Sequence, residues 1–306
     1  MSILVEFPQQ YYTDFGSTAF AAFTPKPDFD LHNARAMMWM SQLAYETGQQ
    51  ATIDHAKALW GFDTIDKIIL RDASVIKRVA FDTRGVLAER NDAIVIAFGG
   101  TDWAVWENLV TDFNVVPRQG TDTHPGFQAA ADAALPLIKS AFLKGKPVFL
   151  TGHSLGAALA VLASFHAHTA NTPPMAVYLF GCPRVGNSNF VTRYNAALGD
   201  VSYRLVHGHD VVPCVPPPDL AFHHIGRMLA CASGGKFDPA AALAPLSGDD
   251  PQLGASLRTS LQQRFQGLLS GTILAPPGPG PLGQMFRLLP MPFRDHLQDR
   301  YLDALA

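Results

Sequence analysis

Cysteine is scarce in this chain, with only three residues among 306. An odd, small number of cysteines argues against a framework of disulfide bonds, so the hydrophobic core must stabilise the fold. The sequence also lacks an uninterrupted run of about 20 apolar residues, the length that a membrane-spanning helix needs. We therefore expect neither a disulfide-rich module nor a transmembrane segment.

Positive charge is sparse as well, because 23 Lys and Arg residues stand against 26 Asp and Glu residues, for a formal net charge of −3. No stretch is rich in Lys or Arg, so we expect no nucleic-acid partner. The first 15 residues lack the basic segment and apolar run of a signal peptide. We expect a protein that is either cytoplasmic or exported without a cleaved leader.

Apolar residues are plentiful, at 48% of the chain, and many of them lie in short runs. The runs that predict buried strands are 93–98, 147–151, 176–180 and 201–206. The intervening stretches that predict helices are 126–143, 155–169 and 187–197. Strands that are apolar on both faces and alternate with helices are typical of a parallel sheet covered on both sides. We predict an α/β fold with a mostly parallel central sheet, formed by a single domain over 1–306.

The segments before these strands carry weaker signals. Residues 1–30 are rich in Pro, aromatic and polar residues, and we expect them to be irregular. Apolar residues at helical spacing predict a covering helix over 33–47. Residues 65–90 predict short antiparallel strands that end in a turn around 82–85.

The C-terminal third has a different composition. Leu and Phe recur every three or four residues over 251–269, which predicts an amphipathic helix. Residues 271–283 are dominated by Gly and Pro and predict a loop. The last stretch, 294–305, predicts a short helix. We therefore treat about 232–292 as an inserted helix plus Pro/Gly-rich loop.

A nucleophile motif follows the second buried strand. The segment Gly152-His153-Ser154-Leu155-Gly156 lies between the apolar run PVFLT and a stretch rich in small residues, AALAVLAS. A Gly-x-Ser-x-Gly segment between a strand and a helix holds its serine on a sharp turn, where larger side chains at the two glycine positions would clash. Ser154 is therefore the candidate nucleophile, whereas its neighbour His153 points elsewhere and is expected to pack or hydrogen-bond.

The acid and the base should follow the serine in that order. Asp210 comes just after a buried strand, where α/β sheets place functional groups, and it is favoured over Asp200 and Asp219. The candidate histidines downstream of the motif are His207, His209, His223, His224 and His296. Of these, His296 fits a base on a late loop. The other four lie close to Asp210 in sequence. Together with Asp210 they are residue types that can bind a metal ion, but because no cysteine ligands join them, we expect no metal.

Several motifs in order resemble those of the class 3, or fungal-type, triacylglycerol lipases, and we expect a bacterial-type member of that family. The segments that carry the resemblance are AIVIAFGGTDW, THPGFQAA, VFLTGHSLGAALA, YLFGCPRVGN and YRLVHGHDVVPCVPP followed by His224-Ile225-Gly226. The resemblance covers roughly 33–228 and the C-terminal histidine. It implies an α/β-hydrolase fold with helices on both faces of the sheet.

The resemblance also assigns roles. Ser154, Asp210 and His296 match the catalytic triad, and His224 matches a structural histidine. The backbone N–H groups of Thr101 and Leu155 match the oxyanion hole. The family usually has Arg-Gly just before the oxyanion residue, whereas this sequence has Gly99-Gly100. The interval between Asp210 and His296 is also long.

The expected activity is hydrolysis of carboxylic esters, acylglycerols in particular, through an acyl-enzyme and without a cofactor. The segment 102–113 lies where the family carries its lid. Its candidate lid and substrate-binding residues are Trp103, Trp106, Leu109 and Val110. An apolar face on such a lid predicts transient contact with a lipid interface. The alternatives are an esterase for short soluble esters, a non-catalytic lipid-binding module and a metal-dependent hydrolase.

Overall fold

The computed structural model describes residues 6–71, 82–100, 121–216, 221–244, 246 and 294–306. Several of the sequence-based expectations fall outside these residues. They concern Thr101, the candidate lid at 102–113 with Trp103, Trp106, Leu109 and Val110, the helix over 251–269 and the loop over 271–283.

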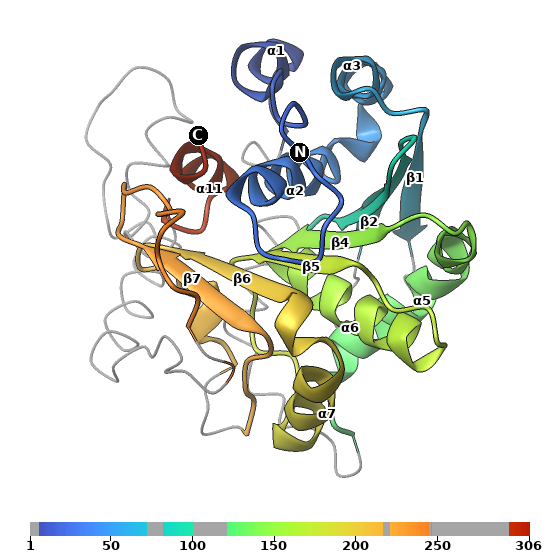
Figure 1. The fold of residues 1–306 in the computed structure, drawn as a ribbon. Helices are drawn as coiled ribbons and strands as arrows, with labels where there is room; N and C mark the ends of the chain where they lie inside the picture. The colour runs from blue at the N-terminus through green and yellow to red at the C-terminus, as the bar shows by residue number, and fades with distance from the viewer. Residues whose placement is uncertain (1–5, 72–81, 101–120, 217–220, 245, 247–293) are drawn as a thin grey trace, which may run out of the picture.

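A seven-stranded sheet runs through the molecule, with its strands in sequence order from β1 to β7 (Figure 1). The strands are β1 (Thr64–Arg71), β2 (Asp82–Glu89), β3 (Ile94–Phe98), β4 (Val148–His153), β5 (Ala176–Phe180), β6 (Ser202–His207) and β7 (Arg227–Cys231). Neighbours from β1 to β3 pair antiparallel, and neighbours from β3 to β7 pair parallel. The prediction of a mostly parallel sheet is therefore confirmed.

Helices cover both faces of this sheet (Figure 1). The helices on one face are α1 (Gln9–Gly16), α2 (Leu31–Leu43), α3 (Gln50–Trp60) and α11 (Gln298–Ala304). Those on the other face are α5 (Pro125–Ile138), α6 (Leu155–Thr169) and α7 (Ser188–Leu198). The short 3-10 helices are η1 (Glu46–Gly48), η2 (Lys139–Leu143), η3 (Gly199–Val201) and η4 (Val212–Cys214). Within the described ranges, no helix combines the length and the apolar character that crossing a membrane requires.

The sheet divides the hydrophobic core into two clusters. Strand β3 shows how, because all its side chains are buried and alternate ones join opposite clusters. Val95 and Ala97 pack toward α2, whereas Ile94, Ile96 and Phe98 pack toward α5 and α6. This is the reason why the strand is a continuous apolar run rather than an alternating one.

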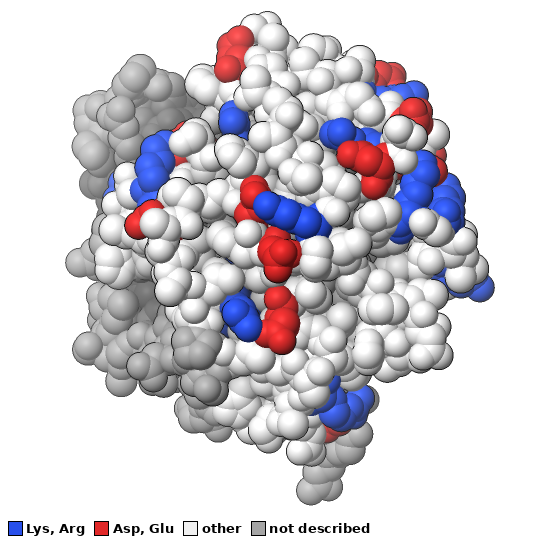
Figure 2. Space-filling model, viewed as in Figure 1, with Lys and Arg blue, Asp and Glu red and all other residues white. Residues whose placement is uncertain are grey.

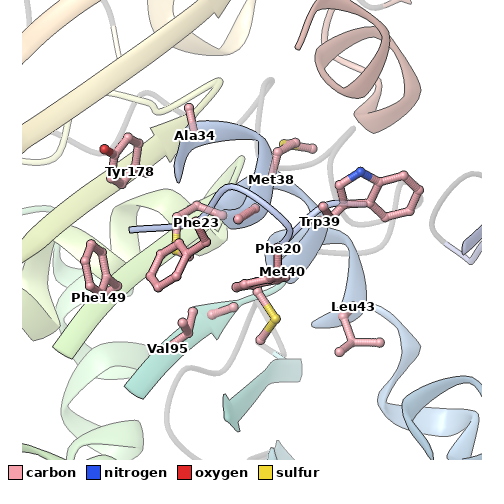
Figure 3. Packing of buried hydrophobic residues seen from close by; sticks show 14 of the residues in the cluster. Phe20, Phe23, Ala34, Met38, Trp39, Met40, Leu43, Val95, Phe149 and Tyr178 are labelled. Atoms are coloured by element: carbon pink, nitrogen blue, oxygen red, sulfur yellow. The ribbon is translucent and has the colours of Figure 1, made fainter. Parts of the chain in front are cut away.

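Figure 3 shows part of the cluster on the α2 side, where aromatic and Met side chains fill the space between helix and sheet. Phe23 lies edge-on against Phe149 of β4, with ring centroids 5.2 Å apart. Trp39 and Met40 extend from α2 into the same cluster. On the face drawn in Figure 2, basic and acidic side chains are interspersed.

The expected turn around 82–85 is wrong, because these residues belong to β2 and pair with β1. The misleading signal is Gly85. A Cβ atom at this position would lie 2.6 Å from the carbonyl oxygen of Ala97 on the neighbouring strand. The glycine therefore permits close approach of two strands instead of reversing the chain.

The N-terminal region is also more regular than expected, since α1 occupies part of 1–30. Its aromatic side chains follow helical spacing: Tyr11 lies between Phe7 and Phe15, with ring centroids 4.6 Å and 4.5 Å away. Tyr12 is fully buried and packs on Trp39 at 5.3 Å. Contact with α2 thus stabilises a helix too short to be stable alone. The sequence did not predict α3 or β7 either.

Candidate active site

The nucleophile motif forms a sharp turn between β4 and α6. Strand β4 ends at His153, helix α6 begins at Leu155, and Ser154 between them has φ 60° and ψ −129°. A non-glycine residue with positive φ is strained, and such strain concentrates at functional sites. The amide of Ser154 donates to the carbonyl of Phe180 at the end of β5, 3.0 Å away, which fixes the turn to the sheet.

The two glycines of the motif are required by space. A Cβ atom on Gly152 would lie 2.2 Å from the carbonyl oxygen of Gly156. A Cβ atom on Gly156 would lie 2.1 Å from the carbonyl oxygen of Phe98 on β3. Helix α6 therefore starts in direct contact with the sheet, and its N-terminal N–H groups lie at the serine.

Asp210 lies just beyond the end of β6 and is buried. Its Oδ1 accepts a hydrogen bond of 2.8 Å from the amide of Val212. Its Oδ2 accepts from Nδ1 of His296 at 2.8 Å and from the hydroxyl of Tyr301 at 2.6 Å. Both carboxylate oxygens are thus held by donors, and the structure brings together an acid and a histidine that are 86 residues apart in sequence.

The ring of His296 lies against the nucleophile turn. It stacks on the ring of His153, with centroids 4.4 Å apart. Because the carboxylate of Asp210 accepts a hydrogen bond from Nδ1–H, the other ring nitrogen, Nε2, is the one that can accept a proton in the neutral imidazole. This arrangement is the one a histidine needs to act as a base with an aspartate behind it.

His153 is held by hydrogen bonds and does not act as the partner of Asp210. Its Nε2 lies 2.7 Å from the backbone oxygen of His296, and its Nδ1 lies 3.0 Å from the hydroxyl of Tyr45. A carbonyl only accepts, so Nε2 carries the ring proton and the Tyr45 hydroxyl donates to Nδ1. Burial, followed by the neighbouring His296, lowers the pKa of His153 well below its usual range. The expectation that His153 packs and hydrogen-bonds agrees with these contacts.

Two glycines outside the motif also border the site. A Cβ atom on Gly181, which has φ 55°, would lie 2.7 Å from Asp210 Oδ2 and 2.8 Å from His296 Nδ1. A Cβ atom on Gly100 would lie 3.0 Å from Cβ of Ser154 and 2.3 Å from the hydroxyl of Tyr45. The chain after β3 therefore passes close to the serine, where larger side chains would not fit.

Three of the other candidate histidines make contacts elsewhere. His224 is buried, and its Nε2 donates to the carbonyl of Pro213 at 2.7 Å. Burial lowers the pKa of His224 well below its usual range. His207 and His209 lie around Asp295. Across the described ranges, no three His, Cys, Asp or Glu side chains are grouped so that they could hold a metal ion.

The sequence reasoning missed three residues near the pair: Tyr301, Gly181 and Asp295. Gly181 directly follows a buried strand, and Asp295 directly precedes the candidate base, so position alone marks both. Tyr301 carries a weaker signal, an aromatic residue with a polar end shortly after that histidine. The residues assigned from sequence outside the described ranges are Thr101 and the candidate lid residues.

Comparison with known proteins finds similarity to lipases, both in a family model and in individual relatives. Residues 95–220 match the model of the family described as lipase (class 3). The secreted mono- and diacylglycerol lipase 1 of Fusarium solani is 36% identical over 131 residues, which are 38% of each chain. The chain thus spans well under half the length of that relative.

Solved structures share the fold. Lipase II from Rhizopus niveus superposes with a TM-score of 0.53 at 21% identity, over 72% of this chain and 89% of that one. A triacylglycerol lipase described as having a serine protease triad at its catalytic centre gives 0.51 at 25% identity, over 67% of this chain and 81% of that one. The sheet and helices described above are those of the α/β-hydrolase fold. By its motifs and by these matches, the chain is similar to the class 3 lipases, most clearly over residues 95–220.

Proposed function

We propose that this protein is a serine hydrolase that cleaves carboxylic esters, with acylglycerols as its substrate class. The observation that carries the proposal is the buried Asp210–His296 pair, joined at 2.8 Å, beside a serine on a strained strand-to-helix turn. An idle serine would not require a positive φ or such a pair next to it.

The reaction proceeds in two steps through an acyl-enzyme. His296 Nε2 takes the proton of Ser154 Oγ as that oxygen attacks the ester carbonyl, and then gives the proton to the leaving alcohol. Asp210 keeps the ring in the required tautomer and stabilises its positive charge. A water molecule, activated by the same histidine, then attacks the acyl-enzyme and releases the carboxylic acid.

The negative charge that develops on the substrate oxygen needs backbone donors. The N–H group of Leu155, at the first turn of α6, is one donor, and the helix dipole adds to its effect. From its place in sequence, directly after Gly100, Thr101 supplies the other. Losing one such donor costs about 3–4 kcal/mol of transition-state stabilisation.

Acylglycerols are proposed as substrates because the Fusarium relative is a mono- and diacylglycerol lipase. The segment 102–113, with Trp103, Trp106, Leu109 and Val110, is proposed from sequence as a lid that contacts lipid interfaces. We also propose that 1–306 form one domain with an insertion at about 232–292. An esterase for short soluble esters is the second candidate.

The deciding experiment combines labelling with kinetics. A fluorophosphonate should modify Ser154 only, and Ser154→Ala should abolish both labelling and ester hydrolysis while the circular dichroism spectrum stays unchanged. Ser164→Ala is the matched control, because Ser164 is also buried in α6 but bonds to Val161 and Tyr194. Labelling of another serine, or full activity in Ser154→Ala, contradicts the proposal.

Esters of graded acyl length separate the two substrate classes. A lipase should hydrolyse long-chain acylglycerols and should gain rate when a short triglyceride exceeds its solubility limit. Activity confined to short soluble esters, with a plain saturation curve through that limit, would instead favour the esterase.

A further inference from the structure

Asp295 directly precedes the candidate base and is itself buried. Its carboxylate is divided between two donors: Oδ2 accepts from the amide of His209 at 2.8 Å, and Oδ1 accepts from the hydroxyl of Ser233 at 2.8 Å. His209 directly precedes Asp210, and Ser233 follows β7. A single side chain thus connects the segment of the base with the segment of the acid and with the chain beyond β7.

Gly208 shows that this contact is built into the backbone. It has φ 55°, and a Cβ atom on it would lie 2.3 Å from Oδ2 of Asp295. Its conformation turns the chain after β6 so that the amide of His209 faces the carboxylate. Any larger residue at this position would be strained and would displace the Asp295 side chain.

The backbone of Asp295 makes a further contact to the same segment. The amide of Gly234 donates to Nε2 of His207 at 3.1 Å, so that nitrogen carries no proton. The ring proton therefore lies on Nδ1, which is 3.2 Å from the carbonyl oxygen of Asp295. The side chain of Asp295 thus contacts His209 and its backbone contacts His207, so both hold the short segment 207–209.

These contacts run beside the candidate catalytic pair. His209 directly precedes Asp210, and Asp295 directly precedes His296. The hydrogen bond between His209 and Asp295 therefore lies next to the hydrogen bond between Asp210 and His296. We propose that Asp295 is a positioning residue, which locks the segment of His296 onto the segment of Asp210 and so keeps Nδ1 and Oδ2 at hydrogen-bond distance. This inference rests on the proposed ester hydrolysis.

The chemistry of the side chain makes the inference specific. Asp295→Ala leaves the amide of His209 and the hydroxyl of Ser233 without their acceptor in a buried place. In Asp295→Asn, the amide oxygen still accepts from His209, and the Ser233 hydroxyl rotates to accept from the new NH₂ group. Geometry is therefore lost in the first variant and retained in the second.

Steady-state kinetics on a soluble ester are the first test. Asp295→Ala should lower kcat by about 10²-fold with little change in KM, because a small misplacement of a catalytic group has an effect of that size. Asp295→Asn should recover most of the lost rate. Ser233→Ala removes one of the two donors, and its kcat should lie between those of Asp295→Ala and the parent. This variant replaces Asp295→Ala in the test if Asp295→Ala does not fold.

The second test does not depend on activity. The proton on Nδ1 of His296 should give a low-field ¹H NMR signal that disappears in His296→Ala. In Asp295→Ala this signal should broaden through faster exchange, and in Asp295→Asn it should persist. The matched control is Asp122→Ala, which removes a carboxylate that anchors Asn187 and Arg193 elsewhere, and it should leave the signal and kcat unchanged.

The outcomes separate this inference from the proposed function. If the parent protein neither hydrolyses esters nor reacts with a fluorophosphonate, the proposed function fails, and the NMR signal alone decides the positioning role. If the parent is active and folded Asp295→Ala matches it in kcat and signal, the inference is wrong. It is also wrong if Asp295→Asn is as impaired as Asp295→Ala, because charge and not geometry would then matter.

Discussion

The hydroxyl of Tyr301 donates a hydrogen bond of 2.6 Å to Oδ2 of Asp210, the oxygen that also accepts a hydrogen bond from Nδ1 of His296. Tyr301 is fully buried, and the hydroxyl also accepts from the amide of His207 at 3.2 Å. Burial, together with the charge of Asp210, raises the pKa of Tyr301 well above its usual range, so the hydroxyl stays a donor at any ordinary pH. Tyr301 therefore helps to hold the carboxylate group of Asp210 in place, facing His296.

Tyr301→Phe should lower kcat/KM for ester hydrolysis by about tenfold, because a hydrogen bond to a charged group is lost beside the reacting histidine. Tyr194→Phe is the matched control. Tyr194 is also buried, but its hydroxyl contacts Ser164 and Ser202, so this variant should lose stability and keep its kcat. Equal kinetics for the two variants would show that Tyr301 only packs.

His296→Ala and His224→Ala should behave differently. The first should lower kcat on the order of 10³-fold or more, as removal of a triad base does. The second removes the hydrogen bond to Pro213 and leaves a buried space, so it should lower the melting temperature and retain activity per folded molecule. Measuring both quantities for both variants decides the assignment, and an exchange of their effects would make His224 the base.

Gly156→Ala tests whether α6 must touch β3. The added Cβ would meet a backbone oxygen that has no freedom to move, so unfolding free energy should fall by about 1–3 kcal/mol and the turn at Ser154 should be displaced. Activity should fall more than stability alone explains. Gly48→Ala is the control, because its Cβ would meet nothing closer than 4.0 Å. Wild-type labelling rates in Gly156→Ala would contradict this account of the motif.

Glu46 provides a pH-dependent contribution to stability. It is buried, and its Oε1 accepts from the amide of Phe7 at 2.7 Å, the hydroxyl of Tyr12 at 3.1 Å and Nε2 of Gln42 at 3.0 Å. Burial raises the pKa of Glu46 to about 7, against the effect of these donors. Between the usual glutamate pKa and about 7, Glu46 is therefore protonated in the folded protein and ionised in the unfolded chain.

The contribution of Glu46 is therefore complete in acid and is lost as the pH rises through about 7. Glu46→Gln should flatten this part of the profile of unfolding free energy between pH 5 and pH 8, measured with urea, and should be the more stable protein at pH 8. Asp54→Asn, which changes an exposed acid on α3, should leave the profile as it is. A Glu46→Gln profile with the parent's slope over this range would refute the prediction.

Local signals explain what the sequence predicted well. The buried strands are continuous apolar runs because both faces are covered, and the motif around Ser154 is recognisable because sterics fix its glycines. Signals that depend on distant partners were misread or missed. Gly85 serves a neighbouring strand, and Tyr301 acquires its role only when α11 packs beneath Asp210, 91 residues away in sequence.

The order of the site along the chain has a consequence for synthesis. Ser154 and Asp210 leave the ribosome well before His296 and Tyr301, which complete the hydrogen bonds of the carboxylate. A nascent chain that has folded only as far as β7 has a nucleophile and an acid but no base. Under the proposed function, hydrolysis begins only after the segment that carries His296 and Tyr301 has emerged and docked.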